Sequence, residues 1–360
     1  MSTSPDGIYE PGIVDPGFPV TNSTKPFWLS QPLEISKLHL TCSLYACRPG
    51  AKIVVIKARD LCSGATGRNS GHCKVMSLGE ALKVMHFKHI YLEEMGKCTR
   101  ENNIKCNLRL HEGVDVYHDN HTFGRAVRAL EDMRRHAPDL GVRYIVYTLQ
   151  ADLNARHCPK ESVKAIGMPS RSAWPYKFVT GLFKNIEESN NFTTMHITRG
   201  AIKLPIVIHT TNAWISHLVP KLRLFMSPVR ANVQRHLPPK SKSITINNSL
   251  WLCYAEHDYN YMTETQGATI KITHAWSGCV AFTQDGNPFV RKWPGPGRKH
   301  QWVCGAYQGI RMVRAFRSAQ ALASMILGED SNGSSSFPQS MIVTRERLGR
   351  LEGVVNMAKL

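Results

Sequence analysis

Several common sequence signals are absent from this chain of 360 residues, and each absence removes a class of protein. Ten cysteines are present, but none forms a C-x-x-C pair, so neither a zinc ribbon nor a thioredoxin-like motif is indicated. Residues 1–19 are polar and rich in proline and glycine, which predicts neither a secretory signal nor a membrane span. Without a sign of export, we expect a cytoplasmic protein with reduced thiols and no membrane partner.

Acidic residues are also scarce, because 27 Asp and Glu stand against 45 Lys and Arg, for a formal net charge of +18. Such an excess attracts anionic partners. The basic residues are scattered rather than packed in runs, so we expect a flavin or another phosphate-bearing ligand and no nucleic acid. Hydrophobic residues make up 42% of the chain, which predicts a globular protein of one or two domains.

The stretch from Ile53 to His72 joins an apolar run to a loop rich in glycine. Residues 53–56 are all apolar and β-branched, which is typical of a strand covered on both faces in a parallel sheet. In the loop, backbone N–H groups and the Ser and Thr hydroxyls can face an anion, and Arg68 adds positive charge. Taken alone, such a loop fits an ordinary strand–loop connection about equally well.

The run KARDLCSGATGRNSGH, residues 57–72, closely resembles a segment of FAD-dependent oxidoreductases of the D-amino-acid-oxidase-like (DAO) family. There, the end of a strand holds the adenosine ribose, and the following loop passes along the pyrophosphate towards the flavin ring. The resemblance implies that FAD is the cofactor, with Arg68, Asn69 and His72 nearest the ring. By the same resemblance, the FAD contacts from this loop are Ser63, Gly64, Thr66, Gly67, Arg68, Asn69, Gly71 and His72.

Later segments carry the same resemblance. Residues 209–214 (HTTNAW) are similar to the family's A-T-N-A-W turn, and residues 276–289 follow its W-x-G…F-T-x-D-G-x-P pattern. Residues 305–316 (GAYQGIRMVRAF) align with the family's last flavin-contacting loop. The resemblance implies that these segments contribute further FAD contacts through Asn212, Trp214, Gly309 and Met312.

Two residues are candidates for binding the substrate. By resemblance, Trp276 forms a wall of the substrate pocket and Arg230 holds a substrate carboxylate, which a guanidinium can grip with two parallel bonds. A surface arginine is the simpler interpretation of Arg230. No catalytic acid or base and no metal ligand is predicted, and His86 and His89 are interpreted as surface or packing residues.

The chain also departs from the family pattern. No G-x-G-x-x-G precedes Ile53, and the segment after Lys37 is about half the roughly 25–30 residues that a strand, turn and helix occupy. Lys57 stands where an acidic residue normally accepts hydrogen bonds from the ribose. In the last loop, Ala306 and Arg311 replace glycines, and a long side chain at Arg311 is a steric obstacle to a flavin ring.

The fold class that these observations predict is α/β. An incomplete Rossmann-like FAD-binding domain is expected at residues 38–100, 170–227 and 276–328, and a second α+β domain with a mostly antiparallel sheet at 101–169 and 228–275. An N-terminal arm (1–37) and a C-terminal tail (329–360) complete the expected division. Apolar periodicity predicts helices over 78–95, 123–133, 175–186 and 315–326, and strands at 113–117, 142–147, 206–208 and 302–304.

Three functional hypotheses follow. The first is an FAD-dependent oxidoreductase that oxidises a C–N bond of a small amine or amino acid by hydride transfer to flavin, with dioxygen as the reoxidant. The second is a degenerate or truncated, non-enzymatic family member that no longer binds FAD. The third is a basic interaction protein that keeps phosphate binding through residues 63–71. Visible flavin absorption of the purified protein separates the first hypothesis from the second.

Overall fold

The structure is a computed structural model that describes residues 62–69, 71–74, 82–188, 204–237, 248–253, 259–262, 271–329 and 337–357. The N-terminal arm, the strand predicted at residues 53–56 and Lys57 lie outside these residues. The described chain is a mixed α/β protein with one large sheet, one small sheet and a long two-stranded ribbon. The predicted fold class is therefore confirmed.

The large sheet has the strand order β1–β4–β2–β7–β8, with β3 paired to β4 beside this path. All its pairings are antiparallel except that of β2 with β7, as the sequence predicts for the second domain. Its strands are β1 (His72–Lys74), β2 (Arg109–Tyr117), β3 (Ile145–Tyr147), β4 (Lys164–Ser172), β7 (Asn248–Cys253) and β8 (Tyr259–Met262).

The small sheet has the order β10–β11–β5, in which β11 runs parallel to β5 and antiparallel to β10. Its strands are β5 (Val207–His209), β10 (Phe289–Lys292) and β11 (Gln301–Gly305). The ribbon consists of β6 (Met226–Leu237) and β9 (Lys271–Thr283), which pair in antiparallel register from Met226 opposite Thr283 onward.

Helices account for most of the remaining described chain. The α-helices are α2 (Leu82–Glu101), α3 (Asn120–His136), α4 (Pro138–Gly141), α5 (Gln150–Ala155), α6 (Pro175–Glu188), α7 (Ile215–Leu218), α8 (Arg311–Leu327) and α9 (Arg345–Met357). The short 3-10 turns are η2 (Ala65–Gly67), η3 (Asn212–Trp214), η4 (Pro220–Leu224) and η5 (Gln339–Met341).

Local sequence explains where several helices begin and end. The carboxylate of Asp119 caps α3 by accepting a hydrogen bond from the Thr122 amide at 2.7 Å, and this bond lowers the pKa of Asp119. Pro175 opens α6, where the missing amide proton of proline costs no hydrogen bond. Gly328 ends α8 with φ of +74°, a left-handed conformation that glycine adopts without strain.

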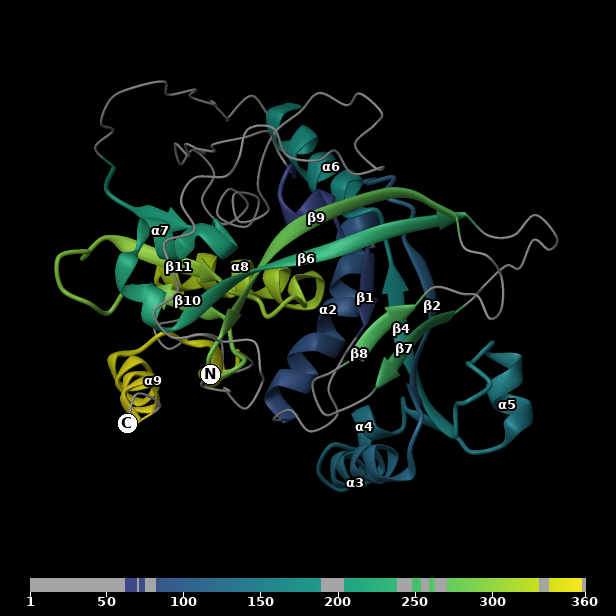
Figure 1. Ribbon diagram of the computed structural model, residues 1–360. Coiled ribbons are helices and arrows are strands. Elements are labelled where there is room, and N and C mark those ends of the chain that lie inside the picture. The colour runs from purple at the N-terminus through teal and green to yellow at the C-terminus, as the bar shows by residue number, and fades with distance from the viewer. Residues whose placement is uncertain are drawn as a thin grey trace.

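The helices divide between the two sheets, and α2 lies between them (Figure 1). In this view α8 and α9 lie beside the small sheet, whereas α3, α4 and α5 lie at the lower end of the large sheet. The β6–β9 ribbon starts near α7 and reaches across towards the large sheet. Because α2 packs on α8 and on α4, its apolar side chains join two of the hydrophobic clusters.

Most predicted elements are present, with shifted limits. The helix predicted at 78–95 extends to Glu101, and the strand predicted at 142–147 is shorter because Val142 and Tyr144 bond back to α4 as a turn. Helix α9 was not anticipated within the predicted tail. Its start is marked by Thr344, whose hydroxyl accepts a hydrogen bond from the Arg347 amide at 3.0 Å.

Candidate functional site

The glycine-rich loop folds as a compact turn around η2. The amide of Gly67 donates to the carbonyl oxygens of Cys62 and Gly64, at 3.0 and 3.2 Å. Asn69 uses both ends of its side-chain amide here: its nitrogen donates to the Ala65 and Thr66 carbonyls, each at 3.0 Å, and its oxygen accepts from the Gly71 amide at 2.8 Å. Asn69 therefore fixes the path of the loop from within.

Arg68 joins this loop to strand β9. Its side chain is buried, and it donates from Nε to the Ser63 carbonyl at 2.7 Å and from Nη1 to the Ser277 carbonyl at 2.8 Å. In return, the indole nitrogen of Trp276 donates to the Arg68 carbonyl at 2.8 Å. Two predicted site residues that are far apart in sequence, Arg68 and Trp276, thus lie in direct contact.

The glycines of the loop serve different purposes. A Cβ atom on Gly67 would lie 2.3 Å from the Cys62 carbonyl oxygen, and one on Gly71 would lie 1.9 Å from that of Ala173. These two glycines make room for the chain's own backbone. Gly64 differs, because no described atom lies within 4 Å of the position its Cβ would take. The half-buried Gly64 is therefore not required for the packing of the described residues.

His72 follows the loop as the first residue of β1. Its ring packs edge-on against that of His111, with the ring centres 5.7 Å apart. Burial, together with the positive potential of His111 and Lys74, lowers the pKa of His72 to about 4. The imidazole is therefore neutral at pH 7. The neighbouring thiol of Cys73 is also uncharged, because burial raises its pKa to about 12.

Asn212 connects the second predicted segment to the third. It has φ of +50°, and its side-chain oxygen accepts hydrogen bonds from the amides of Ala306 and Tyr307, at 3.0 and 3.4 Å. Trp214 closes the same short turn and packs, half-buried, on the cluster around Phe225 and Phe289. The turn at 212–214 and the loop at 305–310 therefore form one unit.

The loop of residues 305–310 turns through left-handed backbone. Ala306, Gln308 and Gly309 have φ of +63°, +57° and +69°. Ala306 stands where the family pattern has glycine, so this position has kept the conformation that glycine favours. The loop is held to β9 by the Gln308 amide, which donates to the Ala281 carbonyl at 2.9 Å. Gly309 is exposed at the tip of the loop.

The start of α8 completes this segment. Met312 lies in the first turn of α8 and packs, partly buried, against the cluster that also contains Cys73. The side chain of Arg311, expected to be an obstacle, lies outside the described part of the molecule. Because α8 also contacts β1, the 305–312 segment lies close to the strand that carries His72.

Strand β9 brings the three predicted cofactor-binding segments together. It contacts η2 through residues 276–278, and it contacts η3 and the 305–310 loop near Ala281. These two contact points are three to five residues apart, or roughly 10–16 Å along a strand. Each of the three segments therefore reaches β9, although they are far apart in the sequence.

The two predicted substrate residues are placed differently. Trp276 is buried on β9 beside the glycine-rich loop, whereas Arg230 is exposed on β6, with Cys279 as its backbone partner on β9. Arg230 therefore remains a candidate for binding a substrate carboxylate only from the solvent side of the ribbon. Neither assignment is decided by geometry, and both stay predictions.

Sequence reasoning missed a buried ion pair next to this site. Lys74 on β1 contacts the carboxylate of Asp115 on β2, and both side chains are buried. The lysine stem crosses over Gly113, where a Cβ atom would lie 3.1 Å from Lys74 Cγ. The only local signal is a lysine and an aspartate at inward positions of strands, and that signal does not identify the partner.

The described part of the chain contains neither a metal-binding cluster nor a helix suited to a membrane. No three His, Cys, Asp or Glu side chains there are grouped so that they could hold a metal ion. None of the helices in those ranges combines the length and the apolar character needed to cross a bilayer.

The fold and the gathered loops define a two-sheet α/β protein in which a glycine-rich turn, a second short turn and a left-handed loop meet along one strand. A family model described as FAD dependent oxidoreductase, DAO, matches residues 40–272. This match spans more than half of the chain, so the chain belongs to the DAO family of FAD-dependent oxidoreductases. The matched range includes Ser63–His72 and Asn212, whereas Trp276, Gly309 and Met312 lie beyond it.

Solved structures agree on the fold. L-proline dehydrogenase from P. horikoshii is similar with a TM-score of 0.67 at 14% identity, over 86% of this chain and 95% of that chain. Glycine oxidase from Geobacillus kaustophilus reaches 0.66 at 12% identity, over 85% and 95%. L-amino acid deaminase from Proteus vulgaris, with its specific insertion deleted, reaches 0.64 at 14% identity, over 85% and 90%. No curated protein matches the chain.

Proposed function

We propose that this chain binds FAD along the edge of β9 and oxidises a C–N bond of a small amine or amino acid. The observation that supports the cofactor is the left-handed 305–310 loop, which keeps a glycine-like path although Ala306 stands there in place of a glycine. Three solved relatives in fold are a proline dehydrogenase, a glycine oxidase and an amino acid deaminase, which supports an amine or amino acid as the substrate class.

The residues present fit a flavin nucleotide along the glycine-rich loop. Gly64 leaves open space there, and Ser63 and Thr66 bring hydroxyl donors to the same turn. Arg68 contributes a buried positive charge that favours a phosphate nearby. In this proposal Ser63, Gly64, Thr66 and Gly67 lie along the phosphates, and Arg68 lies where the phosphates give way to the flavin ring.

The ring end is assigned to Asn69, Gly71 and His72 together with the second and third segments. His72 stays neutral at pH 7, so it acts there by hydrogen bonding and shape and not by charge. Asn212, Trp214, Gly309 and Met312 form the opposite border, with the amides of the 305–310 loop held by Asn212 and Ala281. Because these amides already donate within the protein, the path of the loop is set before a ligand binds.

When bound, FAD would accept a hydride from the carbon next to the amine nitrogen, water would hydrolyse the resulting imine, and dioxygen would take the two electrons as hydrogen peroxide. The role of the protein is to bind the cofactor and the substrate and to orient them relative to each other. Trp276 would border the substrate, and Arg230 would attract its carboxylate. A general base is not assigned, because a neutral amine can donate a hydride without one.

A second candidate is a family member that does not bind FAD. It is favoured by Lys57 and by the absence of a G-x-G-x-x-G before Ile53, since both remove usual contacts to the adenosine half. The two candidates differ in one observable property. A purified protein that shows flavin absorption, directly or after incubation with FAD, supports the enzyme, whereas a colourless protein that stays colourless supports the alternative.

The position of the cofactor is tested with Gly64→Leu. Because nothing described surrounds the Gly64 Cβ position and its backbone is extended, the variant should unfold at the same temperature as the wild type. A leucine there should block a nucleotide and weaken FAD binding at least tenfold in a fluorescence titration. Gly349→Leu is the matched control, since Gly349 has equally open surroundings on α9. Equal FAD affinity of Gly64→Leu and wild type would contradict the placement.

A further inference from the structure

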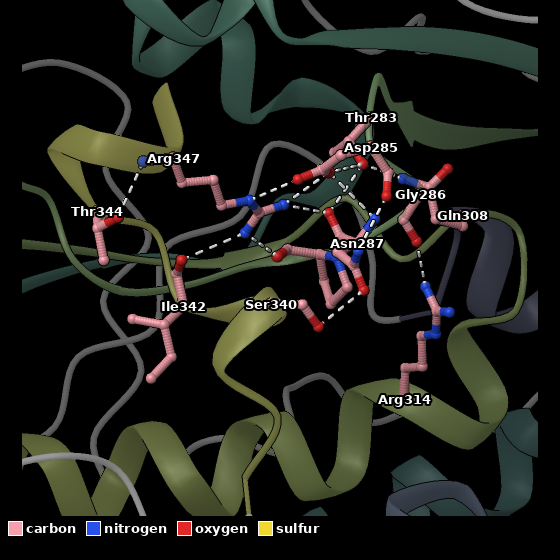
Figure 2. Close-up of polar contacts among 11 residues, drawn as sticks. Thr283, Asp285, Gly286, Asn287, Gln308, Arg314, Ser340, Ile342, Thr344 and Arg347 are labelled. Carbon is pink, nitrogen blue, oxygen red and sulfur yellow. Dashed lines mark hydrogen bonds and ion pairs between the residues drawn. The ribbon is translucent and has the colours of Figure 1, made fainter. Parts of the chain in front are cut away.

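The turn between β9 and β10, residues 283–288, is held by an arginine from the C-terminal helix (Figure 2). Arg347 donates from Nε to Asp285 Oδ2 at 2.7 Å and from Nη2 to Asp285 Oδ1 at 2.9 Å. This two-pronged ion pair joins residues that are 62 positions apart in the chain. Arg347 is buried, at 3% exposed, whereas the Asp285 side chain is partly open to solvent, at 27%.

The remaining donors of Arg347 are also used. Nη2 donates to the Asn287 carbonyl at 2.8 Å, and Nη1 donates to those of Pro288 and Ile342, at 2.9 and 3.5 Å. All five N–H groups of the guanidinium therefore have acceptors. The guanidinium carbon also lies 4.5 Å from the centre of the Phe289 ring. A lysine, with one compact ammonium group, cannot make this set of bonds.

The turn is hydrogen-bonded in its own right to the loop at 305–310. The Thr283 hydroxyl donates to the Asn287 carbonyl at 2.8 Å and accepts a hydrogen bond from the side chain of Gln308. Gln308 is the central left-handed residue of that loop. A continuous set of contacts therefore runs from Arg347 through the turn and Thr283 to Gln308, and Figure 2 shows it in one view.

The other side of the turn is held by α8. Buried Arg314 donates from Nη1 to the Gly286 carbonyl at 2.8 Å. Since α8 follows directly after the 305–310 loop, the turn contacts the loop and the helix that continues from it. Displacing the turn would therefore disturb both borders of the loop.

The tail has its own anchors besides Arg347. Met341, Ile342 and Val343 are each at most 1% exposed, and the Val343 amide donates to the Val290 carbonyl at 3.1 Å. Phe337 packs edge-on against Phe87 of α2. These contacts should hold the C-terminal segment in place when the Arg347 side chain is shortened, so a variant at this position can report on the loop without losing the segment.

We propose that Arg347 is a positioning residue: the C-terminal helix sets the conformation of the 305–310 loop through the 283–288 turn, and thereby sets FAD affinity. The second half of this proposal rests on the proposed function, because the loop is the part assigned to the flavin. The first half concerns the chain alone, and it can be measured without any cofactor.

The test compares Arg347→Lys with wild type by hydrogen–deuterium exchange of the full chain without added FAD. We expect amides 306–310 to exchange at least tenfold faster in the variant, while those of β5 and β2 keep their rates. Arg350→Lys is the control, since Arg350 lies on the same helix with an exposed partner, Glu346, at 2.8 Å. Asp285→Asn removes the carboxylate charge with little change in shape, and it should reproduce the result if Arg347→Lys does not fold.

FAD titration of the same proteins supplies the second readout. Arg347→Lys should raise the dissociation constant about tenfold, and Arg350→Lys should leave it unchanged. Unchanged exchange at 306–310 would overturn the positioning role. Faster exchange throughout the protein would also overturn it, because it would show that Arg347 only stabilises the whole fold. Equal FAD affinity in variant and wild type would overturn the link to the cofactor. Faster local exchange in a protein that binds no FAD would support the positioning role and contradict the proposed function instead.

Discussion

The loop at residues 62–71 and the loop at 305–310 both turn sharply, but by different means. In the first, Gly67 and Gly71 are required because a side chain would collide with the chain's own carbonyls. In the second, Ala306 and Gln308 take a left-handed backbone that costs roughly 1–2 kcal/mol for each non-glycine residue. That cost is offset by the hydrogen bonds that the backbone amides of Ala306 and Gln308 donate to Asn212 and to Ala281 of β9. In the first loop, glycine is therefore required because no side chain fits. In the second loop, tertiary hydrogen bonds hold non-glycine residues in a left-handed conformation.

The largest effect is expected at Gly71. In Gly71→Ala, the new Cβ atom would meet the Ala173 carbonyl oxygen at 1.9 Å, at a residue with φ of +81°. We expect a loss of about 4 kcal/mol or more in unfolding free energy, measured by urea denaturation. Gly64→Ala is the control and should stay within about 0.5 kcal/mol of wild type. A small loss at Gly71 would show that the first loop is also held mainly by its surroundings.

The next largest effect is expected from acid, which should lower the stability more through His72, beside the first loop, than through His209. The pKa of His72 is about 4 in the folded protein and its ordinary value is 6.5, so the unfolded chain binds the proton more readily between these values. The contribution of His72 to stability, about 3 kcal/mol, is complete above about pH 6.5 and is lost as the pH is lowered through 4. Urea unfolding at pH 7 and pH 4.5 should show a smaller acid loss in His72→Gln than in wild type.

His209 provides the comparison for that measurement, because it lies on β5 opposite Val303 of β11, the strand that leads into the 305–310 loop. Burial lowers its pKa as well, but a hydrogen bond with Gln301 opposes the shift. His209→Gln should therefore reduce the acid loss less than His72→Gln. Equal pH dependence of both variants and wild type would show that neither imidazole is held neutral by the fold.

A loss of about 2 kcal/mol is expected for Asn212→Ala. The substitution removes the acceptor of two buried amides, those of Ala306 and Tyr307, and it leaves alanine at φ of +50°. Asn212→Asp keeps an acceptor oxygen and tolerates this backbone, so it should lose less than about 1 kcal/mol. Thermal unfolding of both variants measures the difference. Similar losses in the two would indicate that the contact to the 305–310 loop contributes little.

The smallest effect is expected at the tip of the second loop. Gly309→Ala places a side chain at φ of +69°, with the Phe282 ring at an ordinary contact distance of 3.4 Å, and should cost about 1 kcal/mol. Gly286→Ala has the same φ with no described atom nearby, so it should cost a similar amount. Thermal unfolding measures both variants. A much larger loss of stability in Gly309→Ala than in Gly286→Ala would show that a side chain at position 309 collides with its surroundings.

Local patterns predicted much of the fold. The helices α2, α3, α6 and α8 follow apolar periodicity, and Pro175 and Gly328 mark limits that the structure confirms. Helix α9 was missed because its pattern is short and follows a Ser- and Gly-rich segment, although Thr344 is a typical capping residue. The start of β3 was misjudged because Val142 and Tyr144 are apolar enough for a strand but complete a turn after α4.

The candidate site was predicted only as separate segments. The resemblance placed Arg68 and Trp276 in the same site, and the structure brings them into contact. It gave no indication of the Lys74–Asp115 pair or of the contacts between Arg347 and Asp285. These partners lie 41 and 62 residues apart, and each pair forms only when particular strands and helices are in register.

The amino-acid sequence by itself determined the family, the positions of most helices and strands, and the need for Gly67, whose Cβ would meet the carbonyl oxygen of nearby Cys62. These properties depend on residues that are neighbours in the chain, and periodicity and backbone sterics act at that range. Tertiary structure alone decided that Ala306 and Gln308 adopt left-handed backbone and that Arg347 fixes a distant turn. Both outcomes depend on hydrogen bonds between segments that meet only after packing, and the local sequence does not specify which donor meets which acceptor.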